Sequence, residues 1–225
     1  MNITIAPSVY DRIPDFKAGI IQYEHITVSD SPQMLKGRLR LFQEQLHFDL
    51  MDKKVTDYGT IQDWRRLFKT LGSDPNRYRP SAEALYRRIA KQQFLDPVHS
   101  AVDMNTFLSL QYGIPLGLYD ADKIKGDVLL AVGDETDTYE GINNRVNTLA
   151  DIPVTKDSRG AFGSPYVDSK RTAVTAGTVN ALHVFYFSPS MEPAEGQQLL
   201  QAAGTMFTQI SGGEFEARVL YLDRG

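Results

Sequence analysis

The order of helix-like and strand-like segments is the feature that most restricts the fold of this chain. Between residues 31 and 112 the apolar side chains recur every three or four positions, as in amphipathic helices. Segments rich in β-branched and aromatic residues predict strands at 2–10, 16–28, 128–133, 179–187 and 215–223. Helices and strands therefore do not alternate regularly, which favours an α+β fold over a doubly wound sheet. No Pro/Ser-rich linker divides the sequence, so we expect one domain over residues 1–225.

Capping residues and glycines predict where the helices begin and end. We expect helix starts at Ser31, which would cap a helix with Pro32 in its first position, and at Thr60, Ser81, Asp103 and residue 193. Gly72 and Gly113 follow the last apolar residues of two of these helices, where a left-handed glycine commonly ends a helix. Pro115 stands just beyond Gly113, so the helix that starts at Asp103 should be followed by a sharp change of direction.

Composition excludes several classes of protein. The sequence contains no cysteine, so it has no disulfide frame and no thiolate metal site or nucleophile. No run of about 18 apolar residues predicts a membrane span, and residues 1–16 do not have the pattern of a signal peptide. A cytoplasmic location follows as the default. The net charge of −4 argues against general binding to nucleic acid, which needs clustered cations.

The basic residues are nevertheless concentrated in one stretch, 77–91. Arg77, Arg87 and Arg88 are our candidates for contacts with RNA, and only Glu83 opposes them. The alternative is a solvated helix flank, in which these charges serve solubility alone.

Searches for common catalytic motifs find no phosphate-binding loop, dinucleotide fingerprint, zinc-protease helix or nucleophile elbow. The histidines are not spaced as a metal pair, and we expect neither a metal nor another cofactor. His183 stands inside an apolar strand and is expected to be a hydrogen-bonded core residue. His99 precedes Asp103 by four residues, so the two side chains could meet across one helical turn.

Polar residues without an obvious structural role gather in three stretches and are our candidates for substrate binding. They are Arg79 before the third helix, Asn105 and Ser109 in the fourth, and Arg171 and Thr172 in the loop "GSPYVDSKRTAV". Arginine side chains and free backbone N–H groups at a helix start are suited to bind carboxylates or phosphates. Helix capping and ordinary turn formation are the alternative explanations.

The segment "VDMNTFLSLQYGIPLGLYDADKIKG", residues 102–126, resembles the B3/B4 domain of the phenylalanyl-tRNA synthetase beta subunit. The blocks "DPNRYRPSAEALYRRI" and "GSPYVDSKRTAV" resemble free-standing relatives of that domain, and the resemblance is strongest over residues 65–220. It implies an α+β fold with a mixed β-sheet, tRNA or aminoacyl-tRNA as a partner, and hydrolysis of wrongly attached tyrosine in the synthetase itself.

The residues of the synthetase editing pocket map onto this sequence incompletely. The resemblance places Asn105 where the synthetase has a hydroxyl residue, and Gly117 where it has a histidine just after the Gly-x-Pro turn. The segment "ALHVFYF" supplies no carboxylate where the synthetase has a glutamate. We therefore expect Gly117 to leave room for a different or larger ligand, in one cavity with Asn105, and we assign no catalytic residue.

Two functional hypotheses follow from the residues and the resemblance. The first is a trans-acting esterase that hydrolyses mis-acylated aminoacyl-tRNA, with the oxyanion stabilised by backbone N–H groups and Arg171. The second is a non-catalytic module that binds RNA or an amino-acid-like small molecule. A metabolic enzyme on the same scaffold is a third alternative.

Overall fold

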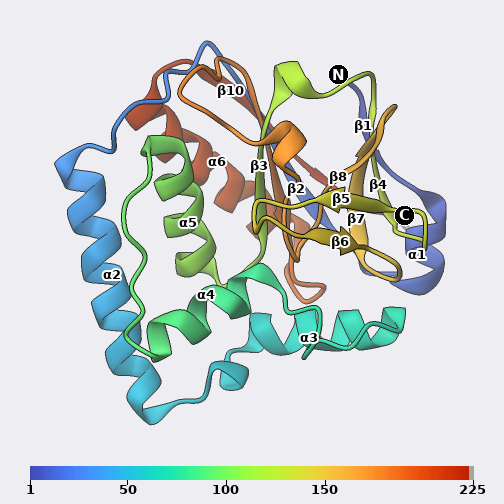
Figure 1. Ribbon diagram of the computed structural model, residues 1–225, viewed down its shortest axis with the longest axis horizontal. Coiled ribbons are helices and arrows are strands. Elements are labelled where there is room, and N and C mark those ends of the chain that lie inside the picture. The colour runs from blue at the N-terminus through green and yellow to red at the C-terminus, as the bar shows by residue number, and fades with distance from the viewer. Residues whose placement is uncertain (223–225) are drawn as a thin grey trace.

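A computed structural model describes residues 1–222 of the chain, and its centre is a twisted antiparallel sheet (Figure 1). The strand order in this sheet is β10-β2-β9-β3. Its strands are β2 (Ala18–Glu24), β3 (Leu116–Asp120), β9 (Ala181–Tyr186) and β10 (Glu214–Leu220). The two most buried strands of this sheet are β9 and β3. β3 lies inside the segment 102–126 that carries the family resemblance, and β9 follows the block "GSPYVDSKRTAV". The predicted strand at 215–223 is confirmed as far as Leu220, and residue 223 lies outside the described part.

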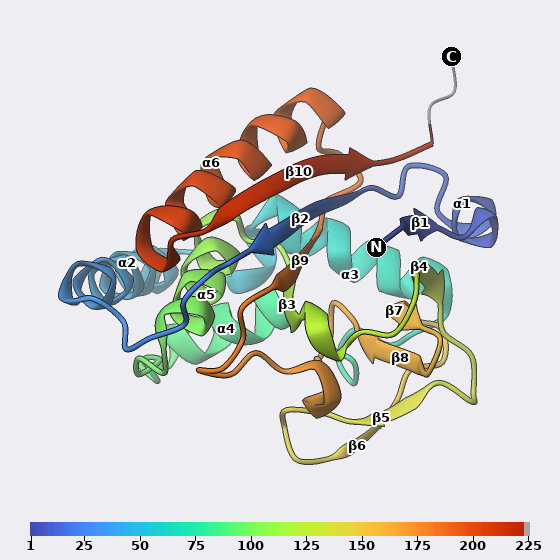
Figure 2. The same cartoon turned by 90° about the horizontal axis from the view of Figure 1, so that it is seen from above.

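The two faces of this central sheet bury different hydrophobic cores. Successive side chains of a strand point to opposite faces, and Ile21, Leu118 and Phe185 enter a core shared with α2, α5 and α6. Ile20 and Val184 point the other way, into a core shared with α3 and a second sheet. Figure 2 shows α6 lying over β10 and β2, with the second sheet beyond β3 and β9. We call the first side the helix face and the second side the sheet face.

The second sheet has the order β1-β4-β7-β8, and its strands are β1 (Ile3–Ile5), β4 (Val128–Val132), β7 (Pro153–Asp157) and β8 (Gly160–Gly163). β1 pairs with β4 in parallel and the other pairs are antiparallel, so this sheet is mixed. A small hairpin, β5 (Thr138–Glu140) and β6 (Val146–Thr148), lies beside it. The predicted α+β class with a mixed sheet is confirmed, although the strands are divided among separate sheets.

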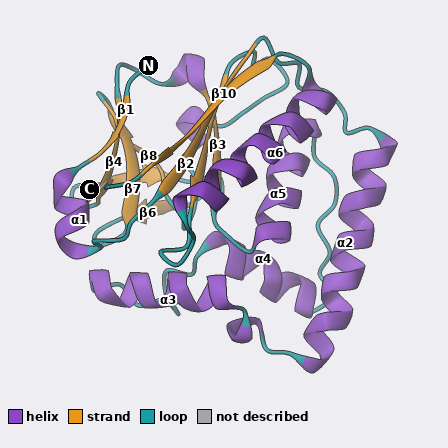
Figure 3. Cartoon of the chain, turned by 180° about the vertical axis from the view of Figure 1, so that it is seen from behind, coloured by secondary structure: helices purple, strands orange, loops and turns teal. Residues whose placement is uncertain are grey.

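The helices surround this strand core, as the colouring by secondary structure shows (Figure 3). They are α1 (Pro7–Arg12), α2 (Gln33–Asp52), α3 (Gly59–Leu71), α4 (Ser81–Ala90), α5 (Ser100–Tyr112) and α6 (Pro193–Ser211). Gly72 and Gly113 end α3 and α5 in the left-handed conformation, as predicted. None of the helices described in residues 1–222 is long and apolar enough to cross a membrane.

Two predicted caps, Ser81 and Asp103, are wrong, because neither residue is the N-cap of its helix. Pro80 is the N-cap of α4, and no side chain caps it, so Ser81 is not the cap. α5 begins three residues before Asp103, and the Nδ1 atom of His99 accepts its capping bond from the Val102 N–H at 3.3 Å. The Asp103 carboxylate instead accepts from the Val98 N–H and the Ser31 hydroxyl.

Ser31 and the first predicted strand also need correction. The Ser31 hydroxyl is bonded to Asp103, and Pro32 takes the N-cap position of α2 without a side-chain bond. Only Ile3–Ile5 of segment 2–10 forms a strand, because Pro7 starts a short helix there. Proline is favoured in the first turn of a helix, where its missing N–H has no partner to lose.

Candidate functional site

The fully buried carboxylate of Glu83 in α4 lies among three guanidinium groups. Nη1 of Arg65, from α3, donates to both carboxylate oxygens at 2.9 and 3.0 Å. Nε of Arg87 donates at 2.8 Å, and Nε of Arg79 lies 3.6 Å away. We call these four residues the Glu83 cluster. One negative charge faces three positive ones, so the cluster keeps a surplus of positive charge.

The pairing of Glu83 with Arg87 follows from helix geometry, because residues four apart lie on the same face of a helix. Arg79 lies in the loop before α4, ahead of the N-cap residue Pro80, and reaches the Glu83 carboxylate from there. The spacing of Glu83 and Arg87 was visible in the sequence and could have predicted their pairing. The buried Nε–H of Arg79 has no hydrogen-bond partner in the structure, so the cluster retains a free donor.

Two more arginines extend this positive surface into solvent. Arg88 follows Arg87 in the last turn of α4 and is exposed. Arg77 is exposed in the loop before α4, and its guanidinium lies 5.0 Å from the ring centre of Tyr78. We call Arg65, Arg77, Arg79, Arg87 and Arg88 the arginine surface. Of the three candidate RNA contacts, Arg87 is held by Glu83, whereas the Arg77 and Arg88 side chains are exposed to solvent.

Asn105 takes part in a buried polar chain on the helix face. Its Oδ1 atom lies 2.9 Å from Nε2 of His183, and Nδ1 of His183 lies 3.4 Å from the Tyr23 hydroxyl. With Nε2 protonated, His183 donates to Asn105 and accepts from Tyr23, so both ring nitrogens are satisfied. Burial lowers the pKa of His183 to about 3. His183 is thus the hydrogen-bonded core residue that the sequence predicted.

A second polar network lies on the sheet face and is centred on Tyr119 of β3. The Tyr119 hydroxyl donates to the Asp168 carboxylate at 2.7 Å and lies 3.4 Å from the Tyr186 hydroxyl. The Tyr186 hydroxyl oxygen in turn lies 2.8 Å from Oγ1 of Thr155. Burial is the main reason why the pKa of Asp168 is raised to about 7, and the bond from Tyr119 opposes that rise. Sequence reasoning placed Asp168 in a polar loop but had no signal for its partner Tyr119.

Gly117 does not open a cavity, contrary to the prediction. A Cβ atom at this position would lie 1.9 Å from the Tyr119 hydroxyl oxygen, and one at Gly163 would lie 2.0 Å from it. The Tyr119 side chain therefore occupies the space between the two glycines. The position that the resemblance assigns to a histidine is filled by the neighbouring tyrosine.

Asn105 and Gly117 also do not share one cavity, because they lie on opposite faces of the central sheet. Leu118 pairs with His183, which contacts Asn105 on the helix face. Gly117 is one residue earlier in the strand and points to the sheet face with Tyr119. The predicted common pocket depended on the register between β3 and β9, which the sequence alone does not show.

Of the remaining predicted binding residues, Ser109 and Arg171 bond to neighbouring structure, whereas Thr172 is only buried. The buried Ser109 hydroxyl donates to the Ile114 carbonyl at 2.7 Å, and so ties the end of α5 to the following turn. Arg171 forms two bonds to the Asp157 carboxylate at 2.8 and 3.0 Å. Thr172 is fully buried, and its hydroxyl has no hydrogen-bond partner. These residues do not meet Asn105 in one site.

Cavities occur at the end of the central sheet where β2 begins and β9 ends. One of about 370 Å³ is lined by Arg12, Asp63, Arg66, Leu67 and others, and a neighbouring one of about 440 Å³ shares Pro189 and Ser190 with it. Hydroxyls of Ser188 and Ser190 donate to Asp63 there. The loop that follows β9 is therefore fastened to α3 at this edge.

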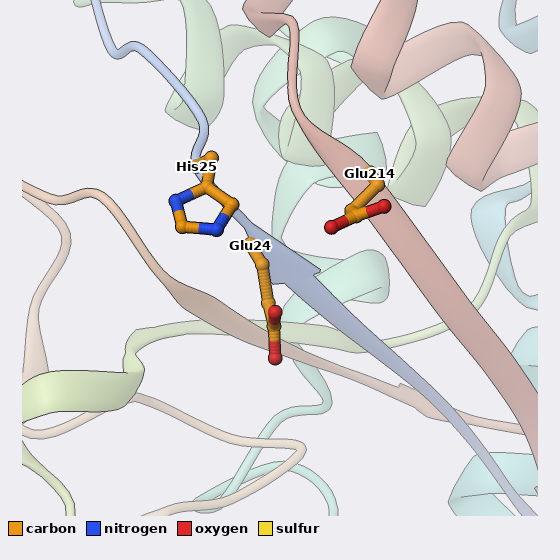
Figure 4. A group of neighbouring side chains, drawn as sticks. All are labelled: Glu24, His25 and Glu214. Carbon is orange, nitrogen blue, oxygen red and sulfur yellow. The ribbon is translucent and has the colours of Figure 1, made fainter.

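Glu24, His25 and Glu214 form a group whose ligand atoms lie within 4.8 Å of one another (Figure 4). Glu24 and Glu214 are direct partners on β2 and β10, where two like charges repel each other. All three side chains are exposed, and the group lies at an outer edge of the sheet. It is a solvated cluster of exposed side chains.

Asp168 and His183 should have opposite effects on stability as pH changes. The pKa of Asp168 is raised from 3.8 to about 7, so its contribution to stability is lost as pH rises through that range. The pKa of His183 is lowered from 6.5 to about 3, so its contribution is lost as pH falls. Between about pH 4 and 6.5 the two effects cancel in the native protein.

Asp168→Asn should remove the effect of Asp168 titration on stability and leave that of His183. We expect the free energy of unfolding of the variant to fall as pH drops from about 6.5 to 4, by up to about 1.4 kcal/mol per pH unit. Urea unfolding at several pH values measures this slope against the native protein. A variant whose slope matches that of the native protein would show that Asp168 does not titrate in this way.

Comparisons with known proteins agree on one family. The model of the family described as B3/4 domain matches residues 63–210. The protein YhzB of Bacillus subtilis (strain 168) is 34% identical over 213 residues, which cover 95% of this chain and 96% of that protein. The phenylalanine–tRNA ligase beta subunit of Rickettsia conorii is 28% identical over 109 residues, covering 48% of this chain and 12% of the subunit.

The ligase beta subunit of Neisseria gonorrhoeae is 25% identical over 130 residues, covering 56% of this chain and 16% of the subunit. The chain thus spans only a small part of these ligase subunits. Among solved structures, an N-terminal fragment of the phenylalanyl-tRNA synthetase beta subunit from Pyrococcus horikoshii is 15% identical, with a TM-score of 0.47 over 95% of this chain and 50% of that fragment.

Proposed function

The chain belongs to the B3/4 domain family, and on that premise we propose that it is a tRNA-binding module whose arginine surface contacts RNA phosphates. Several relatives are beta subunits of an enzyme whose name states that it acts on tRNA. The observation that carries the proposal is the Glu83 cluster, in which three guanidinium groups share one carboxylate. We place this function in the cytoplasm.

The arginine surface has the chemistry that RNA phosphates require. Guanidinium groups bind phosphate oxygens through paired N–H donors, and such contacts dominate the affinity of nucleic-acid complexes. Glu83 orients Arg65 and Arg87 in advance, so less side-chain entropy is lost when a phosphate arrives. Arg77 and Arg88 are free to move and can reach neighbouring phosphates. The negative charge of the rest of the chain confines such binding to this surface.

Charge reversal of the two open arginines tests the proposal. We expect Arg77→Glu combined with Arg88→Glu to weaken binding of labelled tRNA at low salt by about tenfold or more, measured by fluorescence anisotropy. Neither side chain holds the fold together, because both are exposed. Arg159→Glu is a single-reversal control elsewhere on the surface: Arg159 is exposed in the turn between β7 and β8, where the N–H of the preceding Ser158 donates to the Lys125 carbonyl. Equal losses in both variants would contradict the assignment of this surface.

A second candidate function is hydrolysis of mis-acylated aminoacyl-tRNA, and Asp168 is the observation that favours it. A carboxyl group with a pKa near 7 is suited to act as a general base at neutral pH, and Tyr119 holds it in place. Incubation with a panel of mis-acylated tRNAs separates the two functions, because a binding module leaves the esters as stable as a blank does. An amino-acid-like ligand is the alternative partner, and stabilisation of the protein by free amino acids without tRNA binding would favour it.

A further inference from the structure

The outer side of α2 carries an apolar stripe that no element within residues 1–222 covers. Met34, Leu41 and Phe48 are spaced seven residues apart and are 64, 66 and 67% exposed. The inner side of the same helix packs on the helix-face core through Leu35, Leu39 and Leu46. Figures 1 and 3 both show α2 at the edge of the molecule with its outer side free. A seven-residue repeat of apolar side chains is the pattern by which one helix packs along another.

The shape of this surface suits a second helix. Gly37 lies on the outer side, and a Cβ atom there would have no neighbour within 4 Å, so another backbone can approach closely. Beside Leu41 a hollow of about 310 Å³ opens between α2, α5 and α6, lined by Phe42, Phe107 and Met206 among others. From Met34 to Phe48 the stripe is about 21 Å long, at 1.5 Å of rise per residue.

The charges of α2 identify the partner. The first half of the helix contains only basic charges and the second half only acidic ones. They are Lys36, Arg38 and Arg40, then Glu44, Asp49 and Asp52. This order opposes the helix dipole, which favours acids near the start and bases near the end. A second α2 in the antiparallel direction would place each basic half beside an acidic half and offset the unfavourable arrangement.

We propose that two copies of this chain associate through antiparallel α2 helices around a twofold axis near Leu41. Leu41 of one copy then packs on Leu41 of the other, and Met34 of each copy packs near Phe48 of the other. A twofold axis needs a surface that is complementary to itself, and the apolar stripe and the two charged halves have that property.

Sedimentation and mass measurement test the association. At high micromolar concentration the native chain should have the mass of a dimer, twice the monomer mass of 25.2 kDa. The Leu41→Glu variant should have the mass of a monomer. Leu41 is two-thirds exposed, so the substitution leaves the fold intact, which circular dichroism verifies. Val146→Glu, at a 78% exposed apolar residue of the β5–β6 hairpin, is the matched control and should remain dimeric. A native chain of single mass, or a Leu41→Glu variant that still dimerises, would overturn the proposal.

Cysteine crosslinking tests the direction of the helices, because the chain has no cysteine of its own. With a short bismaleimide, Leu41→Cys should form covalent dimers by itself. Met34→Cys and Phe48→Cys should crosslink poorly alone and efficiently when the two variants are mixed. Efficient crosslinking of Met34→Cys with itself would indicate parallel helices and would contradict the antiparallel arrangement.

Charge exchange gives an independent test. Reversing only Lys36, Arg38 and Arg40 to glutamate makes the whole helix acidic and should abolish the dimer. Reversing Glu44, Asp49 and Asp52 to lysine in addition should restore it, since each half again meets its opposite. Failure of the second set to restore association would show that these charges do not pair across the interface.

Discussion

Gly117→Ala is expected to lower the free energy of unfolding by about 3 kcal/mol, at the upper end for an overpacked core position. The new Cβ would overlap the Tyr119 hydroxyl, which Asp168 and the ring's burial hold in place. Tyr119 cannot turn aside without breaking its bond to Asp168 and displacing Gly163. Urea unfolding of the variant and the native protein measures the loss.

The effect of Gly117→Ala should depend on Tyr119. In a Tyr119→Ala background, the blocking ring is absent, so adding the methyl group should change stability by less than about 1 kcal/mol. Gly59→Ala is the control, because a Cβ there has no neighbour within 4 Å. If Gly117→Ala were as harmless as Gly59→Ala, the glycine would not be required by Tyr119, and the filled position would have to be explained differently.

Glu83→Ala is expected to destabilise the protein by about 3 kcal/mol, because removal of one partner leaves buried charge uncompensated. Arg65, Arg79 and Arg87 would then repel one another around an empty position. Their side chains are 18, 37 and 39% exposed, so solvent screens part of the repulsion and keeps the loss at the lower end of the usual range. Added salt should recover part of the lost stability, because it screens like charges.

Glu140→Ala provides the comparison for Glu83→Ala. Glu140 pairs with Lys170 at the surface, and such surface pairs contribute about 1 kcal/mol or less. Thermal and urea unfolding of both variants should therefore differ strongly. Glu83→Ala should also retain tRNA binding at low salt and low temperature, because all arginines remain. Equal stability of the two variants would mean that the Glu83 carboxylate does not hold the cluster together.

Local signals in the sequence predicted much of the secondary structure. A regular apolar spacing predicted α6 at the residues where it forms. Gly72 and Gly113 marked helix ends because only a residue tolerant of positive φ ends a helix in this way at little cost. The helix starts were less accurate, since backbone geometry and the His99 ring replaced the serine and aspartate caps that the sequence suggested.

The candidate site was harder to predict, because it depends on which strands pair and in what register. A shift of one residue moves a side chain to the other face of a sheet, and Asn105 and Gly117 are separated for this reason. We predicted that a ligand would occupy the space beside Gly117, but the Tyr119 side chain occupies it. Conversely, the spacing of Glu83 and Arg87 on one helix was visible in the sequence, but the sequence did not show that Arg65 of α3 and Arg79 of the preceding loop complete the Glu83 cluster.

The salt dependence of tRNA binding tests the central claim most directly. The logarithm of the binding constant should fall linearly with the logarithm of salt concentration, as phosphate contacts release counterions. Reversal of Arg77 and Arg88 should reduce the magnitude of this log–log slope by about 1.5, because two phosphate contacts are lost. Arg159→Glu should leave the slope unchanged. Absence of tRNA binding at low salt, or the same slope in all three proteins, would contradict the assignment of the arginine surface as the RNA-binding site.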